Sequence, residues 1–175
     1  MASNTSWIPY LHLLIPALKG TAIAGSLWSA GAMTTAHTLL PSIYPLVSSS
    51  PKQATQQWNC YYRALSNIVP RTDLTTILIC GGLAYLEYGL RPQGLGWKLW
   101  ATATGLMPLG WVFVWVFILA PSNKLVEMAT ASDSVAKEKQ TEVSSLLEEF
   151  NSLMGVRMLF PWVVGGLAIW ASIGL

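Results

Sequence analysis

The chain has 175 residues, of which 53% are hydrophobic and only 10% are charged, and its mean hydropathy is +0.46. Soluble domains carry about 25% charged residues, so this composition excludes an ordinary water-soluble domain and predicts an integral membrane protein with a single domain over residues 1–175. The formal net charge is +2 and the basic residues are scattered singly, which argues against a nucleic-acid partner.

Stretches without charged residues mark the expected membrane spans, because about 20 apolar residues cross a bilayer core and a charge within it is costly. Three stretches of this kind cover residues 21–40, 99–121 and 158–175, and a fourth, 74–90, has Glu87 near its end. They predict an all-α integral membrane four-helix bundle. Ahead of them, residues 8–18 are apolar but contain Pro9 and Pro16, which predicts a short interfacial segment rather than a further crossing.

The segments that join the spans differ in size. Only Arg91 to Lys98 separates the second span from the third, and its proline and glycine residues predict an antiparallel hairpin. The connection 122–157 is too polar to enter lipid. Its apolar residues recur every three or four positions, which predicts an amphipathic helix that continues into the fourth span. These residues are Val143, Leu146, Leu147, Phe150, Leu153 and Met154.

The distribution of basic residues predicts the orientation. The first and third connections share one side and contain Lys52, Arg63, Arg71, Lys124, Lys137, Lys139 and Arg157. The opposite side contains Lys19, Arg91 and Lys98. The positive-inside rule therefore predicts that both long connections, and with them the amphipathic helix, are cytoplasmic.

The common sequence motifs for phosphate, dinucleotide, serine-hydrolase and zinc-protease chemistry are absent. Two cysteines and two histidines are spaced too far apart along the chain to suggest a metal site. The residues that remain for chemistry are polar side chains near the ends of the predicted spans.

Asn123 and Arg157 are two such side chains. Pro121 disfavours helical geometry at the residue before it, so we expect the third span to end there and to free carbonyl groups beside Asn123. Asn123 can donate and accept hydrogen bonds, although an asparagine here also fits a helix cap. Arg157 directly precedes the fourth span, where an arginine snorkels, pairs with an acid or binds an anionic ligand. We expect the two side chains to meet at the mouth of the bundle.

Trp58 and Tyr62 lie one helical turn apart before the second span. Aromatic residues at a membrane boundary are commonly interfacial anchors, and the functional alternative is a stacking wall for a flat aromatic ligand. Histidine is the residue type best suited to proton transfer near neutral pH. We favour His37 over His12 as a base, because His12 lies in the segment that is not expected to cross; a lone histidine is also commonly a packed residue.

Three segments together resemble the anthrone-oxygenase-like family of small four-helix membrane proteins. They are the W-x-x-x-Y pattern at Trp58–Tyr62, PSNKL at Pro121–Leu125, and LLEEFNSLMGVRMLFPW at Leu146–Trp162. The similarity covers most of the chain. The sequence departs from the family pattern at Lys124, where arginine is more frequent, and at Phe150, where tryptophan is frequent.

The resemblance implies an oxidoreductase of secondary metabolism, a monooxygenase that converts a polycyclic anthrone to an anthraquinone in aromatic polyketide biosynthesis. It implies dioxygen as co-substrate and no metal, flavin or haem cofactor. On this basis we assign His37 as the candidate base, Asn123 and Arg157 as donors to the developing oxyanion, and Trp58 with Tyr62 as the stacking wall. The expected partners are a hydrophobic polycyclic aromatic molecule, dioxygen and membrane lipid.

Two other classes stay open. A non-enzymatic scaffold or accessory subunit would hold a partner through the amphipathic helix 141–154, with Asn123 and Arg157 satisfied by each other or by backbone groups. A transporter fits less well, because there is no internal repeat and no ionisable residue at mid-membrane depth; assembly into a homo-oligomer would change that. A large apolar cavity with both polar groups at its wall would favour the enzyme.

Overall fold

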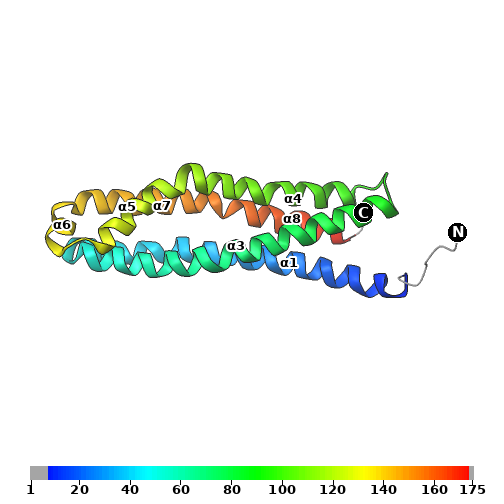
Figure 1. Ribbon diagram of the computed structural model, residues 1–175, viewed down its shortest axis with the longest axis horizontal. Helices are drawn as coiled ribbons and strands as arrows, with labels where there is room; N and C mark the ends of the chain where they lie inside the picture. The colour runs from blue at the N-terminus through cyan, green and yellow to red at the C-terminus, as the bar shows by residue number, and fades with distance from the viewer. Residues whose placement is uncertain (1–7, 174–175) are drawn as a thin grey trace.

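The computed structural model describes residues 8–173, with side chains described from residue 13 onward. Figure 1 shows an elongated bundle of helical rods, with the α3–α4 hairpin at one end and α6 at the other. The rods are α1 (Ile8–Leu39), α3 (Pro51–Leu90), α4 with α5 (Gly96–Phe113 and Leu119–Thr130), and α7 with α8 (Gln140–Arg157 and Leu159–Ile173). The short elements are η2 (Leu40–Ile43), α2 (Tyr44–Ser49), the π-helical turn η3 (Val114–Ile118) and α6 (Asp133–Glu138). No strand occurs within residues 8–173, so the predicted all-α class is confirmed.

Within residues 8–173 the structure offers three candidate membrane spans rather than the four that the sequence predicts. Helical stretches long and apolar enough to cross a membrane cover Leu13–Ser49, Gly96–Thr130 and Gln140–Ile173. The expected second span, 74–90, is helical but lies in α3, which is not among the candidates in the described chain. Apolar side chains nevertheless point outward from α3, α4 and α8. Examples are Leu78, Val112 and Leu159, which are 67%, 57% and 55% exposed. Large exposed apolar surfaces are rare on monomeric soluble proteins and indicate contact with lipid or a partner.

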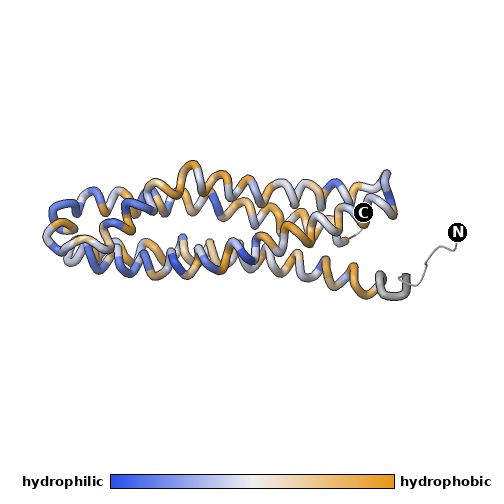
Figure 2. The backbone as a smooth tube through the Cα atoms, viewed as in Figure 1, coloured by the Kyte–Doolittle hydropathy of each residue, from blue (hydrophilic) through white to orange (hydrophobic). Residues whose placement is uncertain are grey.

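The bundle is longer than a bilayer is thick. The 40 residues of α3 reach about 60 Å at the helical rise per residue, roughly twice the thickness of the hydrocarbon core. Figure 2 shows hydrophilic residues gathered towards the α6 end and hydrophobic residues along the middle and around α8. The segment 122–157 is not an irregular loop, because α5, α6 and α7 continue the bundle as its polar half.

The amphipathic helix predicted within that segment is confirmed as α7. Five of its six predicted apolar positions are buried, namely Val143, Leu146, Leu147, Phe150 and Met154. Glu148 and Glu149, which lie off that face, are exposed. The helix runs on into α8 with a break only at Met158. The predicted hairpin is confirmed as well, since α3 ends at Leu90, α4 begins at Gly96 and the two pack along each other.

Pro16 does not interrupt the first helix. The helix α1 is continuous from Ile8 to Leu39 and contains Pro16, so the prediction of a separate interfacial segment over residues 8–18 is wrong. A proline removes one hydrogen-bond donor from the helix, and neighbouring helices and small backbone adjustments compensate for this loss in membrane bundles.

Pro121 does not end the third helix either, which corrects the predicted end of that span. It lies inside α5, which continues to Thr130. In a regular α-helix its ring would collide with the carbonyl of Phe117, four residues earlier. The chain avoids this clash by a wider π-helical turn, η3, in which the amide of Leu119 donates to the carbonyl of Val114, five residues back. The rod changes direction here, between α4 and α5 in Figure 1.

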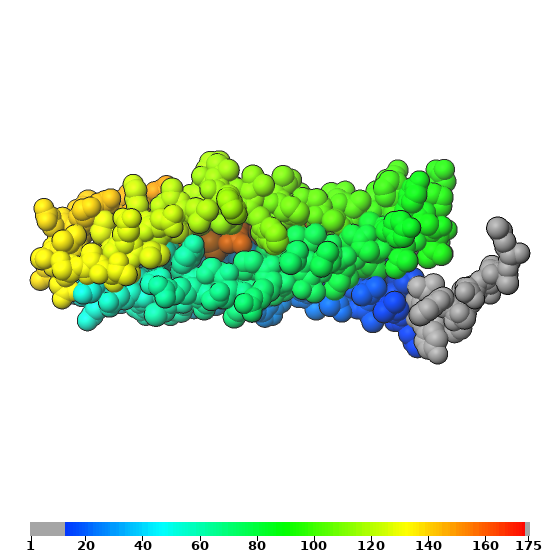
Figure 3. Space-filling model, in the orientation of Figure 1, coloured from blue at the N-terminus to red at the C-terminus, as the bar shows by residue number. Residues whose placement is uncertain are grey.

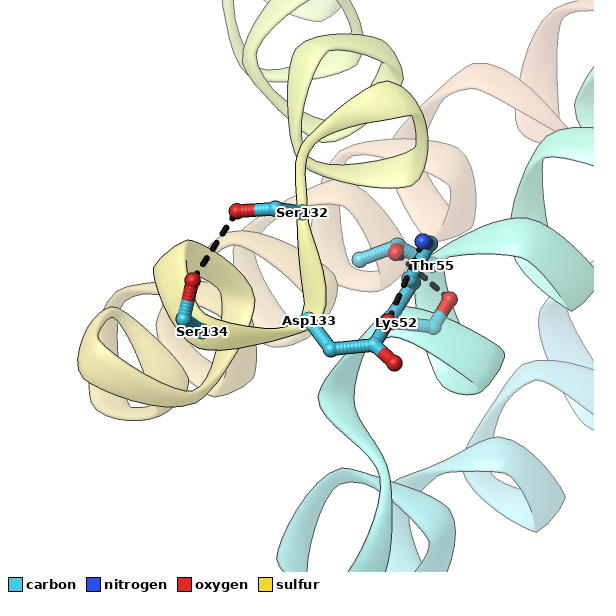
Figure 4. A network of polar contacts seen from close by, with 5 residues as sticks. All are labelled: Lys52, Thr55, Ser132, Asp133 and Ser134. Atoms are coloured by element: carbon cyan, nitrogen blue, oxygen red, sulfur yellow. Dashed lines mark hydrogen bonds and ion pairs between the residues drawn. The ribbon is translucent and has the colours of Figure 1, made fainter.

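Polar side chains connect α3 and α6 at the polar end of the bundle. Figure 4 shows Lys52 at the start of α3 paired with Asp133 at the start of α6, with a distance of 3.1 Å between Nζ and Oδ1. Close by, the Thr55 hydroxyl donates to the Lys52 carbonyl, and the hydroxyls of Ser132 and Ser134 are 3.0 Å apart. Ion pairs at the protein surface contribute little free energy. The pair of Lys52 and Asp133 therefore shows where α6 meets α3 but adds little to the stability of the fold.

Gly25 sets the close approach of α1 to α3. A Cβ atom at Gly25 would lie 2.5 Å from the Thr76 hydroxyl oxygen, whereas one at Gly20 would meet nothing within 4 Å. Overpacking of this kind costs about 1–3 kcal/mol. We therefore expect Gly25→Ala to lower the melting temperature in detergent by roughly 3–10 °C, given the size of the chain. Gly20→Ala is the matched control and is expected to leave it unchanged or raise it. Equal melting temperatures for the two variants would contradict the close helix contact.

Candidate functional site

A cavity of about 350 Å³ opens on the side of the bundle between α3 and the π-helical turn. In Figure 3 the hollow is visible at mid-length, where orange atoms of the α7–α8 rod appear between α3 and the α4–α5 rod. It is lined by Tyr62, Leu65, Ser66, Pro70, Trp111, Val114, Trp115, Ile118, Phe150, Met154 and Arg157. Ligand sites commonly have about 300–1,000 Å³ and a mostly apolar wall with a few polar groups, and this cavity fits that description.

The π-helical turn shapes one wall of the cavity. Val114, Trp115 and Ile118 all belong to η3, and all three line the cavity. Trp115 is 76% exposed, so its ring lies at the rim rather than in the interior. The turn directly precedes α5, which contains Pro121, so the rod is widened ahead of the proline and does not end there.

Arg157 carries the charge of the site. It occupies the last turn of α7, it is half-buried, and it is the one charged side chain among the lining residues. Asp73 is the acidic group whose charge acts most strongly on its guanidinium. A guanidinium at an apolar wall offers several donors to an oxygen atom that gains negative charge.

Asp73 lies behind the cavity wall and is not among the site residues that the sequence predicts. Its side chain is 3% exposed. The hydroxyl of Ser29 donates to Oδ1, and the indole of Trp111 donates to Oδ2 over 3.3 Å. With Arg157 as its electrostatic neighbour, this carboxylate joins α1, α3, α4 and α7. An ionisable side chain is therefore buried within the bundle, directly before the predicted second span.

The polar layer around Asp73 separates two apolar cores. One contains Trp58, Val69, Leu125, Leu147 and Phe150 and lies toward the α6 end. The other contains Cys80, Leu83, Trp100, Met107 and Val164. A sequence signal for this layer did exist, because Asp73 is the only acidic residue between Pro51 and Leu86, and it directly precedes the predicted second span.

Trp58 and Tyr62 form a stacked pair. Their ring centroids are 4.9 Å apart at an interplanar angle of 11°, and Phe150 meets Trp58 edge-on at 5.2 Å. Tyr62 lines the cavity, whereas Trp58 is 1% exposed and lies behind it. The two predicted wall residues are thus together, but only Tyr62 presents a ring to the cavity.

His37 lies beside the cavity, not in it. Its Nδ1 is 3.0 Å from the backbone oxygen of Asn151 in α7. It lines a second and much smaller chamber of about 20 Å³. The chamber and the cavity share the side chains of Tyr62, Leu65, Phe150 and Met154. The side chain of His12 lies outside the described ones.

Asn123 and Arg157 are not brought to one cavity. Asn123 is exposed on α5 and is not among the lining residues. The reason is the helix that continues through Pro121, which carries Asn123 onto an outward face. The catalytic role assigned to Asn123 stays a prediction, without support from its position.

The sequence profile described as anthrone oxygenase matches residues 58–167. The chain belongs to this family. The family resemblance seen in the sequence is thereby confirmed, and an oxygenase-type activity follows at that level. The stretch matched to the anthrone oxygenase family contains every lining residue of the cavity together with Asp73, whereas Ser29 and His37 precede it. Comparisons with curated proteins and with solved structures gave no match.

Proposed function

We propose that this protein is a membrane-bound oxygenase that converts a polycyclic anthrone to an anthraquinone with dioxygen and without a bound cofactor. The observation that carries the proposal is the cavity itself. It has aromatic walls and a single guanidinium, and it lies wholly within the stretch matched to the anthrone oxygenase family. A flat phenolic ketone complements both features, since its rings fit an apolar slot and its oxygen atoms accept hydrogen bonds.

The bilayer surrounds the apolar half of the bundle in this proposal, and residues 74–90 of α3 cross with the three candidate spans. The cavity then lies near the level where the apolar and polar halves meet, and it opens sideways between α3 and η3. A hydrophobic substrate would enter from the lipid without crossing water. The polar half faces the cytoplasm, as the distribution of basic residues predicts.

The chemistry assigned to the site begins with the acidic methylene group of the anthrone. A base removes one proton, and Arg157 stabilises the enolate oxygen that forms. The enolate passes one electron to dioxygen, and the two radicals combine into a peroxide at the same carbon. After protonation the peroxide loses water and leaves the quinone carbonyl. One anthrone and one dioxygen thus give one anthraquinone and one water, and His37 is the candidate base.

Asp73 positions the groups that meet the substrate. Its carboxylate fixes the indole of Trp111, which lines the cavity, and balances the charge of Arg157. Tyr62 offers one ring face to the substrate and has Trp58 stacked on it, so the wall is rigid. A site whose groups are held by their neighbours needs little reorganisation during the reaction.

Oxygen uptake by the purified protein tests the proposed reaction. We expect metal-free protein in detergent to consume one dioxygen per anthrone and to release anthraquinone without hydrogen peroxide. Anthrones also oxidise without an enzyme, so the rate must be compared with that of protein-free detergent and of the Arg157→Leu variant. Rates equal to protein-free detergent with several anthrones would overturn the proposal.

A bulky residue at the cavity mouth gives a second test. Ser66 is exposed and lines the cavity, whereas the adjacent Asn67 is exposed and does not. We expect Ser66→Phe to raise KM or lower turnover at least about tenfold, the loss of a typical steric mismatch. Asn67→Phe should leave both constants unchanged while adding the same ring to the same helix. A loss of activity in Ser66→Phe alone would support a substrate in the cavity. Equal kinetic constants for the two variants would mean that the substrate binds elsewhere.

The scaffold hypothesis is less well supported. It requires the apolar face of helix 141–154 to be free for a partner, but that face packs within the bundle against α5, α2 and α1. The exposed side of α7 carries charged residues, Glu142, Glu148 and Glu149.

A further inference from the structure

The small chamber beside the substrate cavity has the size of a single water molecule. Its volume is about 20 Å³, and a bound water needs at least about 10–15 Å³ of such space. His37, Trp58 and Asn151 line it from α1, α3 and α7. The chamber shares side chains with the cavity, so the two lie next to each other.

Two of the residues that line this chamber each carry a buried polar atom without a protein partner. Among the described residues, the indole Nε1 of Trp58 and the side-chain oxygen Oδ1 of Asn151 are buried without a hydrogen bond. Trp58 is only 1% exposed, so solvent outside the bundle does not reach it. The first atom can only donate and the second can only accept. A water molecule can accept from one and donate to the other at the same time, which makes it a fitting ligand for both.

A hydrogen bond fixes the tautomer of the neutral His37 ring beside this chamber. A backbone carbonyl only accepts hydrogen bonds, so the contact of Nδ1 with the Asn151 oxygen places the proton on Nδ1. In the neutral ring, Nε2 then keeps a free lone pair. Gly155 lets the ring lie close to α7, since a Cβ atom there would be 3.2 Å from Cε1 of His37.

We propose that the chamber binds one water molecule, held by Trp58 and Asn151, which connects the substrate cavity with Nε2 of His37. This inference rests on the proposed function. Tyr62 is the one residue of the shared wall with a hydroxyl group, and it completes the path. Its oxygen takes the proton from the substrate carbon while its own proton passes to the water, and the water gives a proton to Nε2. The products are the enolate, an imidazolium and unchanged water, and the peroxide later recovers the proton by the reverse route.

The water can be detected without any reaction. In full-length protein labelled with 15N at tryptophan, we expect a water cross-peak at the Trp58 indole in a rotating-frame Overhauser spectrum. Trp100 is the internal control, because its Nε1 is also buried without a partner but it lines none of the cavities described above. The variants Trp58→Phe and Trp100→Phe assign the two signals. The absence of a water cross-peak at Trp58, or equal cross-peaks at both indoles, would overturn the water site.

Kinetics test the proton path. Trp58→Phe keeps an aromatic ring but removes one hydrogen bond to the water, so we expect up to about tenfold lower kcat with KM unchanged. Trp100→Phe should change neither constant. His37→Gln should lower kcat by about 100-fold or more, and free imidazole should restore part of it. Normal oxidation by both Trp58→Phe and His37→Gln would overturn the proton path alone. A water signal in a protein that oxidises no anthrone would instead overturn the proposed function and leave the water site standing.

Discussion

Replacing Arg157 with leucine is expected to lower kcat for anthrone oxidation by about 100- to 1,000-fold, the usual loss when one donor to an oxyanion is removed. The guanidinium is the one charged group that lines the cavity, so no other lining residue supplies the same stabilisation. Arg157→Lys keeps the charge but not the fork of donors, and it should retain part of the activity. Initial rates of quinone formation, with the melting temperature of each variant, are the measurement.

Two further variants make this result specific. Arg71 is an exposed arginine on α3 that does not line the cavity, and Arg71→Leu should leave kcat unchanged. Asn123→Ala should also leave it near wild type, because Asn123 is exposed on α5. If Asn123→Ala lost activity as fully as Arg157→Leu, the site would have to be moved towards α5. Wild-type turnover by folded Arg157→Leu would remove the cavity from the mechanism.

Replacing Asp73 with leucine is expected to lower the free energy of unfolding by about 3–6 kcal/mol, since each of its two hydrogen bonds to a charged acceptor contributes roughly 1.5–3 kcal/mol. Three groups lose their acceptor or countercharge, namely the hydroxyl of Ser29, the indole of Trp111 and the guanidinium of Arg157. Glu127→Leu on the exposed side of α5 is the control and should change stability little. Unfolding by denaturant in detergent measures both.

The double variant Asp73→Leu/Arg157→Leu separates charge balance from packing. If the loss arises because Arg157 is left without its countercharge, the double variant should be more stable than Asp73→Leu alone. Additive losses would show that the two side chains act independently. Asp73→Asn, which keeps an acceptor for its neighbours, should be the mildest of these changes in stability while still lowering kcat through Arg157.

Sequence patterns predicted an element correctly where its structure depends on residues close together in the chain. The spacing of apolar residues predicts α7 and its buried face, and the turn residues after Leu90 predict the hairpin, because both follow from contacts a few residues apart. The helix ends predicted at the prolines are wrong, because the conformation there depends on contacts far apart in the chain. Pro16 and Pro121 weaken a helix locally, but in this bundle packing against other helices outweighs that cost.

The sequence by itself determined the helical class, the apolar character and the family, and it singled out Tyr62 and Arg157, which both line the cavity. Only the tertiary structure decided that Asp73 joins Ser29 and Trp111 beside Arg157, that His37 lies in a separate chamber, and that Asn123 faces outward. These residues come from helices far apart in the chain, and no local periodicity records which faces of two helices meet. The cavity depends in addition on a π-helical turn, whose single extra residue rotates every later side chain on that rod.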